Sequence, residues 1–406
     1  MLRTLADLDA TGTTLGVRVD INSPLDGGTL ADDSRVRAHL DTLSELLDRG
    51  ARVAVLAHQG RPGGDEFADL ASHAARLDEL LDAPVDYCDA TFTAAARDRV
   101  GALENGECVV LENTRFYSEE YMEFDPEVAA DTFLVRKLAP ALDAYVNDAF
   151  AAAHRSQPSL VGFPVRVSGY AGRVMEEELA VLGNIESTPE PRVYALGGAK
   201  VVDSLDVARS VLGRGLADHV LVSGVVGNAF LLADGIQLGA ASAHVVNERS
   251  TEAVKRAGDL LDDFANRIHL PRDVAVERGG ERVELDLHEL PAEQAAMDIG
   301  AKTVAAYAEV IDEAGTVICN GPAGVFEEDR FATGTRELFE AATRAEYSIV
   351  GGGDTAAALR QLGIEGFDHI STGGGAALRM LTGESLPAVE ALREDWRAER
   401  PPDPGA

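Results

Sequence analysis

Five basic side chains in the first half of the chain fall at or near the ends of expected strands, and their chemistry suits an anionic ligand. They are Arg35, His58, Arg61, Arg115 and Arg155. Arginine binds phosphate and carboxylate groups well because its planar guanidinium donates two parallel hydrogen bonds. Asp20 and Asn22 follow another apolar stretch and could contact the hydroxyl groups of a substrate. Each of these residues alone could simply cap a helix or form a turn, but the complete set predicts an anion-binding site.

The second half of the chain contains four glycine-rich turns, each directly after an apolar stretch. The turns are Gly197-Gly198-Ala199-Lys200, Asn320-Gly321-Pro322-Ala323-Gly324-Val325-Phe326-Glu327, Gly351-Gly352-Gly353-Asp354-Thr355 and Ser371-Thr372-Gly373-Gly374-Gly375-Ala376. Glycine lets the backbone approach a phosphate closely, and the N-terminus of a helix that begins there favours negative charge. Lys200 would add a mobile positive charge. Together the four turns predict a phosphate-binding site.

Two acidic residues in these turns could also take part in binding. Asp354 could hold Mg²⁺, or it could simply cap a helix that begins at Thr355. Glu327 could accept hydrogen bonds from ribose hydroxyl groups. The spacing Gly351-x-Gly353-x-x-Ala356 matches a dinucleotide fingerprint, a pattern that proves little by itself.

A regular alternation of strands and helices must position these residues. We expect strands at 15–19, 53–57, 109–112, 144–147, 193–196, 219–223, 316–319, 348–351 and 369–371. Apolar residues spaced by three and four predict helices at 35–48 and 126–138, and we expect a further helix at 173–182. This alternation is typical of an α/β fold with parallel sheets, in which ligands bind at the carboxyl ends of the strands. Most of the candidate residues lie at such ends.

The length of 406 residues suits two domains. We expect an α/β protein of two doubly wound, Rossmann-like parallel-sheet domains joined by a hinge helix. The expected ranges are 1–170 for the N-terminal domain, 171–186 for the connecting helix and hinge, 187–385 for the C-terminal domain, 386–399 for a C-terminal segment and 400–406 for a disordered tail.

The charge balance is strongly acidic, with a net charge of −33. Such a chain would repel a phosphate backbone, so we expect no nucleic acid partner. Only Lys137, Lys200, Lys255 and Lys302 are lysines among its 36 basic residues. Many carboxylates with few lysines predict adaptation to high salt, where screening relieves self-repulsion, and loss of the fold in dilute buffer.

The cysteines and the hydropathy pattern indicate in which cellular compartment we expect the protein and whether it forms disulfides. Cys88, Cys108 and Cys319 are far apart and odd in number, so buried free thiols are expected rather than disulfides or a zinc site. No apolar stretch is long enough to span a membrane, and the first residues lack the plan of a signal peptide. We therefore expect a cytoplasmic protein with no membrane partner.

An anion site in one domain and a phosphate site in the other predict phosphoryl transfer across a cleft whose closure excludes water. The sequence has no Walker A loop and no protein-kinase motif, so catalysis would depend on positioning and charge neutralisation. One alternative is an NAD-dependent dehydrogenase, which would need an acidic residue where this chain has Ser371-Thr372-Gly373. Another is a non-catalytic nucleotide sensor, which the presence of Arg35, Lys200 and Asp354 together argues against.

The order of these motifs resembles the phosphoglycerate kinase family along nearly the whole chain. In the first half the matching stretches are Val19-Asp20-Ile21-Asn22-Ser23-Pro24-Leu25, Ala57-His58-Gln59-Gly60-Arg61-Pro62, Leu111-Glu112-Asn113-Thr114-Arg115-Phe116, and Asn147-Asp148-Ala149-Phe150 up to His154-Arg155. The four glycine-rich turns carry the resemblance in the second half. The stretch Arg115-Phe116-Tyr117-Ser118-Glu119-Glu120 resembles the archaeal branch of the family, which fits a halophilic source.

The resemblance implies a monomeric enzyme of glycolysis and gluconeogenesis. It would transfer a phosphoryl group reversibly from 1,3-bisphosphoglycerate to ADP, giving 3-phosphoglycerate and ATP, with Mg²⁺ as cofactor. The implied phosphoglycerate ligands are Asp20, Asn22, Arg35, His58, Arg61, Arg115 and Arg155. The implied nucleotide ligands are Gly197, Gly198, Lys200, Gly300, Asn320, Glu327, Gly352, Gly353, Asp354 and Thr355. Arg35 and Lys200 would act catalytically on the transferring group, and Asp354 would lie nearest the metal. Segment 386–399 would fold back on the N-terminal domain.

Two positions depart from the pattern of this family; one is Ser23, where a valine is usual before the proline and for which we expect no consequence. At the other position, one helical turn after the lysine at position 200, many members carry a second lysine, and this chain has Ser204 there. The residues leave open which group takes over that phosphate contact.

Overall fold

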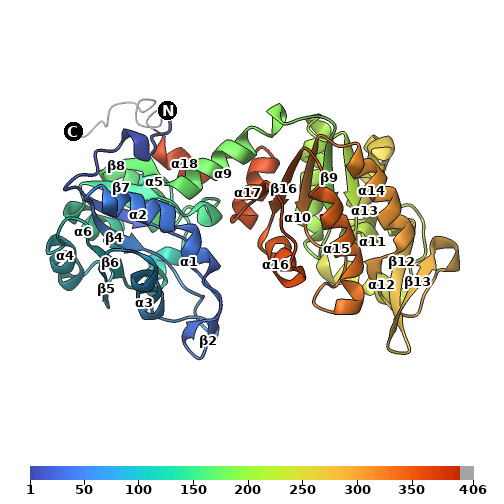
Figure 1. The fold of residues 1–406 in the computed structure, drawn as a ribbon, viewed down its shortest axis with the longest axis horizontal. Coiled ribbons are helices and arrows are strands. Elements are labelled where there is room, and N and C mark those ends of the chain that lie inside the picture. The colour runs from blue at the N-terminus through green and yellow to red at the C-terminus, as the bar shows by residue number, and fades with distance from the viewer. Residues whose placement is uncertain (394–406) are drawn as a thin grey trace. The chain divides into compact units, whose positions relative to one another are not determined.

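The computed structural model describes residues 1–393, which form two units. Unit 1 comprises residues 1–180 and 385–393, and unit 2 comprises residues 181–384 (Figure 1). The boundary near Ala180 falls inside helix α9 (Arg173–Gly183), within the stretch expected to connect the domains. The expected tail at 400–406 and the last part of segment 386–399 lie outside the described residues.

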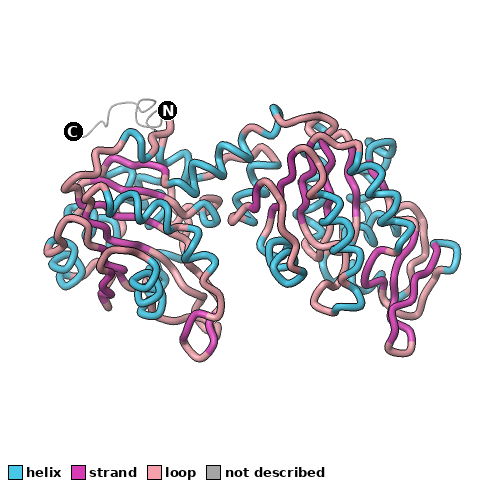
Figure 2. Tube along the Cα trace, viewed as in Figure 1, coloured by secondary structure: helices cyan, strands magenta, loops and turns pink. Residues whose placement is uncertain are grey.

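Unit 1 is built on a six-stranded parallel sheet with helices on both faces (Figure 2). In chain order its strands are β1 (Thr14–Arg18), β4 (Arg52–Leu56), β5 (Val85–Cys88), β6 (Cys108–Leu111), β7 (Ala144–Asn147) and β8 (Ser168–Ala171). Their order in the sheet is β5-β6-β4-β1-β7-β8. The central strands are rich in valine and leucine, because a sheet covered on both faces buries every side chain.

Short helices and a small hairpin complete unit 1. The helices are α1 (Ser34–Ala38), α2 (Leu40–Asp48), α3 (Ala71–Leu80), α4 (Ala94–Gly101), α5 (Pro126–Ala130), α6 (Phe133–Leu138), α7 (Pro158–Val161), α8 (Phe163–Arg166), most of α9, and α18 (Pro387–Leu392). The hairpin pairs β2 (Leu25–Asp26) with β3 (Thr29–Leu30). Helix α18 packs against α7, α8 and β8, and the Ala388 N–H donates to the carbonyl of Ala153.

Two expected helices of unit 1 are each interrupted, and the continuous helices predicted there are wrong. The helix expected at 35–48 is divided at His39, whose buried ring bonds the Asp148 carboxylate. The helix expected at 126–138 breaks before Phe133, where the Glu119 carboxylate accepts from the amides of Phe133 and Leu134. That carboxylate satisfies two of the N–H groups that a new helix start leaves unpaired.

Unit 2 is built on a second six-stranded parallel sheet. Its strands are β9 (Arg192–Leu196), β10 (His219–Val222), β11 (Ile268–His269), β15 (Thr316–Asn320), β16 (Tyr347–Gly351) and β17 (His369–Ile370), ordered β11-β10-β9-β15-β16-β17. Helices on its faces are α10 (Val201–Gly213), α11 (Gly224–Ala233), α12 (Ala240–Arg249), α13 (Ala253–Phe264), α14 (Ala301–Asp312), α15 (Thr333–Ala342), α16 (Gly353–Leu362) and α17 (Gly374–Leu381). The expected fold class, two doubly wound parallel-sheet domains, is confirmed.

A small antiparallel sheet in unit 2 was not expected from the sequence. It contains β12 (Asp273–Arg278), β13 (Glu281–Asp286) and β14 (Ala296–Ile299), in the order β13-β12-β14. Val274, Val276 and Leu285 belong to a separate apolar cluster, and along β13 polar residues alternate with Val283 and Leu285. This alternation is typical of a sheet with one face toward solvent.

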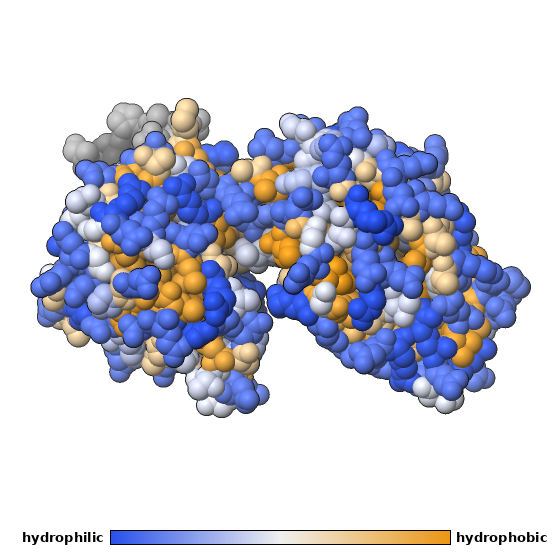
Figure 3. Space-filling view, in the orientation of Figure 1, coloured by the Kyte–Doolittle hydropathy of each residue, from blue (hydrophilic) through white to orange (hydrophobic). Residues whose placement is uncertain are grey.

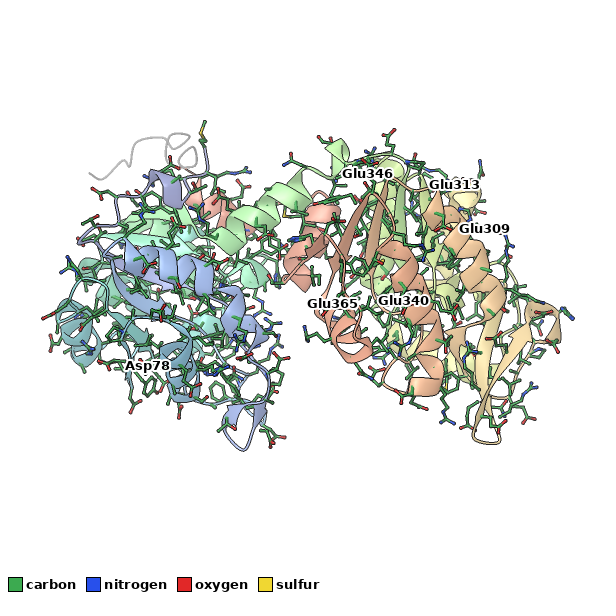
Figure 4. All side chains as sticks on the ribbon, in the orientation of Figure 1. Asp78, Glu309, Glu313, Glu340, Glu346 and Glu365 are labelled. Carbon is green, nitrogen blue, oxygen red and sulfur yellow. The ribbon has the colours of Figure 1, made fainter. Side chains whose placement is uncertain are left out.

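The surface of the molecule is dominated by polar and acidic side chains. Figure 3 shows hydrophilic residues over most of the visible face, interrupted by smaller apolar areas. Figure 4 labels six exposed carboxylates: Asp78, Glu309, Glu313, Glu340, Glu346 and Glu365. An excess of carboxylates that are not matched by cations repels itself unless salt screens the charges.

The helices and the cysteines of residues 1–393 bear on membrane association and on disulfide formation. Within residues 1–393, none of the helices combines the length and the apolar character needed to cross a bilayer. All three cysteines are free. Burial raises the pKa of the Cys108 and Cys319 thiols to about 12, whereas Cys88 is only partly buried, so the expectation of a buried thiol is wrong at that position.

Candidate functional site

The sequence-predicted residues of unit 1 follow four neighbouring strands of its sheet. Asp20 follows β1, His58 follows β4, Arg115 follows β6 and Arg155 follows β7, and these strands occupy adjacent places in the order β6-β4-β1-β7. Arg18, the last residue of β1, is in register with the last residues of β4 and β7. Because the strands are parallel, their carboxyl ends meet at one edge, and the candidate residues gather there.

Arg18 anchors this edge although the sequence did not single it out. Its side chain is only 2% exposed. The Arg18 Nη2 lies 2.8 Å from His58 Nδ1, and its Nε donates to Ser159 Oγ at 3.0 Å. A third hydrogen bond joins its guanidinium to the Val19 carbonyl. Arg18 escaped notice because it falls within the strand expected at 15–19, whereas the candidate basic residues lie at or beyond the expected strand ends.

Asp20 is the anionic partner within this basic cluster. Its carboxylate accepts from Arg35 Nη1 at 2.8 Å. Burial acts to raise the pKa of Asp20, but His58, Arg35, Arg18 and His39 together lower it to about 2. Asp20 therefore stays ionised and holds the half-exposed Arg35 side chain near the cluster.

A buried pair behind Asp20 fixes its backbone. His39 Nδ1 donates to the Asp148 carboxylate at 2.6 Å, which leaves Nε2 free to accept from the Asp20 amide at 3.0 Å. Both side chains are almost fully buried. The pair of His39 and Asp148 was not predicted from the sequence. The signal in the sequence was His39 itself, a polar residue at a position of the expected helix that should face the core.

The remaining basic groups repel one another in the absence of an anion. Burial and then the Arg18 guanidinium hold the pKa of His58 well below its usual range, so its ring is neutral at pH 7. Burial, Arg155 and Arg18 lower the pKa of Arg115 to about 10. A bound anion would relieve the mutual repulsion of these closely spaced cations.

The loop after β4 brings two further predicted residues to this edge. Asn22 Oδ1 accepts from the Gly60 amide at 2.8 Å, and Arg115 Nη1 donates to the Gly60 carbonyl at 2.6 Å. Gly60 has φ of +63°, and a Cβ there would overlap the backbone of Glu66, so the turn requires glycine. Within residues 1–393, the exposed Arg61 side chain has no hydrogen bond or ion pair with another residue and is available to a ligand.

Unit 2 contains a pocket at the carboxyl ends of β9, β15, β16 and β17. Its volume is about 880 Å³, open mouth included. The lining residues are Gly197, Gly198, Ala199, Lys200, Asp203, Ser204, Asn320, Gly321, Pro322, Phe326, Glu327, Gly352, Asp354, Thr355, Gly374, Gly375 and Leu378. The pocket lies beside β9 and β15, where the direction of strand addition reverses, which is the usual ligand position in doubly wound sheets.

Of the ten residues expected as nucleotide ligands, eight line this pocket and two do not. Gly353 lies next to the lining residues Gly352 and Asp354 without contributing itself. Gly300 lies before α14, where a Cβ would overlap the Asp273 carboxylate. That carboxylate accepts from the amides of Lys302 and Thr303 at 2.9 Å and so caps the helix.

Backbone contacts between turns shape the floor of the pocket. The Gly197 amide donates to the Asn320 carbonyl at 2.9 Å, and the Gly198 amide donates to the Pro322 carbonyl at 2.7 Å. Gly321 has φ of +90°, and a Cβ there would overlap Gly197. The close approach of two chains therefore explains the glycines at this point.

An exposed ion pair stands at the pocket. Lys200 Nζ lies 2.9 Å from the Asp354 carboxylate, and the two side chains are 66% and 65% exposed. Asp354 lies in the first turn of α16, whose cap position is Gly352, so the alternative that Asp354 caps this helix is wrong. The Thr355 hydroxyl accepts from the Gly321 amide at 2.7 Å and ties α16 to the neighbouring turn.

The groups of this pocket that favour an anion are mainly backbone groups. Among residues 1–393, Lys200 is the one basic side chain in the lining, against the carboxylates of Asp203, Glu327 and Asp354. Three helices, α10, α16 and α17, begin at the pocket. Their unpaired N–H groups and dipoles attract phosphate. The pocket is thus suited to a polyphosphate accompanied by cations.

Comparison with known proteins identifies strong similarity to one family. The family model described as "Phosphoglycerate kinase" matches residues 5–384. A phosphoglycerate kinase of Natronomonas pharaonis is 74% identical over 97% of this chain and 100% of its own length. One from Halobacterium salinarum is 64% identical, again over 97% of this chain and the whole of the relative.

Solved structures give the same result. A crystal structure of phosphoglycerate kinase from Pyrococcus horikoshii OT3 has a TM-score of 0.92 and 42% sequence identity, covering 98% of this chain and 100% of that one. A phosphoglycerate kinase structure from Coxiella burnetii has a TM-score of 0.82 and 30% identity, with 98% and 100% covered.

Proposed function

Because this chain belongs to the phosphoglycerate kinase family, in its halophilic archaeal branch, we propose that unit 1 binds the phosphoglycerate and unit 2 binds the nucleotide. The chain is an ATP-dependent phosphotransferase of glycolysis that interconverts 1,3-bisphosphoglycerate plus ADP with 3-phosphoglycerate plus ATP. The observation that carries the assignment is the contrast between a buried arginine cluster in unit 1 and a glycine-lined pocket in unit 2.

In unit 1, we assign the charged ends of phosphoglycerate to the basic cluster. Arg61, Arg115, Arg155 and the neutral His58 bind the phosphate, since guanidinium groups match its oxygens in pairs. Asp20 and Asn22 contact the hydroxyl end. Arg35, held by Asp20, is half-exposed and reaches the carboxyl group that gives or accepts the phosphoryl group.

In unit 2, we assign the phosphates of ADP and ATP to the turns at Gly197-Gly198 and Gly352-Gly353. Asn320, Thr355 and Gly300 support the nucleotide loops, and Glu327 accepts from the ribose. Lys200 neutralises the charge that develops on the phosphoryl group, which is the largest contribution a side chain can make to such a reaction.

The same pocket supports a proposal for the contact that the second lysine makes in other members of the family. Ser204 is buried and lines the wall without supplying charge. We assign the phosphate contact of the second lysine to the N-termini of α10, α16 and α17. These three helices begin at the pocket, and the backbone amides of their first turns can donate to phosphate oxygens.

The donor set fits Mg²⁺ as the cofactor. The exposed Asp354 carboxylate, paired with Lys200 in a pocket suited to polyphosphate, matches the preference of Mg²⁺ for one or two carboxylates plus phosphate oxygens and waters. When bound, Mg²⁺ would neutralise phosphate charge. Asp354 would leave Lys200 and turn to the metal, which would free the Lys200 ammonium for the phosphoryl group.

We further propose that the enzyme works as a monomer in the cytoplasm. Every side chain that the assignment uses comes from one chain, so no second copy is needed to complete either ligand site. Light scattering in molar KCl checks the monomer, with a mass near 42.9 kDa expected.

The direct test of the proposed function is a coupled assay in molar KCl with ATP, Mg²⁺ and 3-phosphoglycerate. We expect turnover that requires both substrates. Absence of turnover by a folded wild-type chain would contradict the proposal, and turnover of ATP without 3-phosphoglycerate would contradict the substrate assignment.

A further inference from the structure

A second pocket in unit 2 has no part in the reaction described above. Its volume is about 340 Å³, open mouth included. It lies between the end of α9, strand β9 and the end of α17, and apolar side chains including Leu182, Ile185, Met380 and Leu381 line it.

The feature that points to a ligand is an unsatisfied hydroxyl group. Tyr194 lines this pocket, is 0% exposed, and its hydroxyl oxygen has no hydrogen-bond partner in the structure. A buried hydroxyl without a partner destabilises the folded state, and an acceptor supplied by a ligand would remove that cost. Burial raises the pKa of Tyr194, so the hydroxyl keeps its proton and is a hydrogen-bond donor in need of an acceptor.

The mouth of the pocket favours an uncharged ligand. Arg214 Nη2 lies 3.1 Å from Glu186 Oε1, and both residues belong to the lining. Each charge is already matched by the other. A neutral molecule that carries a carbonyl oxygen meets the needs of this pocket better than an anion, which would have to displace Glu186.

Helix α17 links this pocket to the nucleotide pocket. Gly374, Gly375 and Leu378 at its start line the nucleotide pocket, while Met380 and Leu381 at its end line the second pocket. The helix has eight residues, or about 12 Å at 1.5 Å per residue. Its end is held to α10, since Ser210 Oγ donates to the Thr382 carbonyl at 3.0 Å.

We propose that this site, the Tyr194 pocket, binds a small neutral and mainly apolar molecule through a carbonyl oxygen that accepts from the Tyr194 hydroxyl. Occupation of the Tyr194 pocket displaces the end of α17 and thereby changes nucleotide affinity at its start. The coupling rests on the proposed function, whereas the binding itself does not.

Two probes of the same shape test the binding. Acetophenone carries a carbonyl oxygen, and α-methylstyrene has a CH₂ group in its place. Ligand-observed NMR on the full chain in molar KCl gives both affinities. We expect saturable acetophenone binding that is about five-fold weaker in Tyr194→Phe, and α-methylstyrene binding that is the same in both proteins.

A second variant keeps the test decisive if Tyr194→Phe folds poorly. A Cβ at Gly183 would lie 3.6 Å from Met380 Cε, and Gly183 ends a helix whose geometry suits leucine. Gly183→Leu should fill the pocket and abolish acetophenone binding. Absence of saturable binding to wild type, as when only water occupies the pocket, or equal binding to wild type and variants, would overturn the site.

The coupling is measured by titrating ADP with and without saturating acetophenone. We expect ADP affinity to change by about five-fold or more, and acetophenone affinity to change by the same factor with saturating ADP. Unchanged ADP affinity would overturn the coupling. Failure of ADP to bind at all would instead contradict the proposed function and leave the acetophenone result standing.

Discussion

The two proposed ligand sites would attract negative charge by opposite means. In unit 1, Arg18 and Arg115 are buried and held by hydrogen bonds to His58, Ser159 and the Gly60 carbonyl. In unit 2, the pocket offers backbone amides and helix starts, with one exposed lysine paired to an exposed carboxylate. Buried, fixed cations select one anion of defined shape, whereas backbone amides and a mobile lysine can follow a phosphate that is changing its bonds.

The same contrast holds for buried carboxylates. In unit 1 the surrounding cations lower the pKa of Asp20 to about 2 although burial opposes them. In unit 2 burial raises the pKa of Asp298 to about 6, and the Gly334 amide and Arg282 only partly oppose this. A cluster of cations thus stabilises a buried carboxylate, while backbone amides with one more distant guanidinium do not suffice.

The largest expected effect comes from removing the mobile charge of unit 2. Lys200→Ala should lower kcat about 10²–10³-fold, because this group is assigned to charge that develops during transfer, while the affinity for phosphoglycerate changes little. Lys302→Ala is a matched control, since the Lys302 ammonium pairs with Asp286 away from the pocket lining. Steady-state kinetics decides, and an unchanged kcat in Lys200→Ala would contradict the assigned role.

The next largest effect concerns the affinity of unit 1 for phosphoglycerate. Arg61→Ala should weaken the binding of phosphoglycerate about 10–100-fold, through loss of charge-assisted hydrogen bonds, and leave the binding of ATP near its original strength. Arg99→Ala removes an arginine of the same unit whose partner is Asp86 and should change neither. Calorimetric titration with each substrate alone measures both affinities. If Arg61→Ala weakened ATP binding as much as phosphoglycerate binding, the division between the units would be wrong.

Stability should depend on pH with opposite signs in the two units. Asp20 has a lowered pKa, so its contribution is present above its ordinary value of 3.8 and is lost as pH falls through about 2. Asp298 has a raised pKa, so its contribution is present below 3.8 and is lost as pH rises through about 6. Each effect is on the order of 2–3 kcal/mol.

Chemical denaturation across pH measures these slopes against Asp20→Asn and Asp298→Asn. As pH rises from about 4 to 6, wild type should lose unfolding free energy relative to Asp298→Asn. For Asp20→Asn the shift should appear only on acidification below about pH 4. If the two differences in unfolding free energy changed with pH in the same direction, Asp20 and Asp298 would not have the opposite pKa shifts described above.

The smallest effect concerns the exposed ion pair of unit 2. Asp354→Asn removes the partner of Lys200 and should raise the affinity for ADP without metal about three-fold, since exposed pairs are weak. It should also reduce the gain in affinity that Mg²⁺ brings. Asp312→Asn, whose partner is Arg344, serves as control. Calorimetric titration with and without a chelator measures both, and an unchanged Mg²⁺ gain would exclude Asp354 as a metal ligand.

Much of this architecture could be predicted from the sequence, because apolar strands followed by glycine or arginine give a local signal. The strands near positions 15, 53, 193 and 316 all exist. The missing parts depend on contacts between distant residues. Arg18 reads as a strand residue until His58 and Ser159 are beside it, and the break at His39 depends on Asp148, which lies 109 residues away. The antiparallel sheet at 273–299 was missed because its polar face weakened the apolar signal.

Hydrogen exchange of the wild-type chain with each ligand alone tests the central claim, one ligand for each unit, most directly. With 3-phosphoglycerate, we expect slower exchange in the loops after β1, β4, β6 and β7. With ADP and Mg²⁺, we expect slower exchange at Gly197–Ser204, at Gly351–Thr355 and around Gly374. Protection of the unit 2 turns by 3-phosphoglycerate alone, or of the unit 1 loops by ADP alone, would contradict the account.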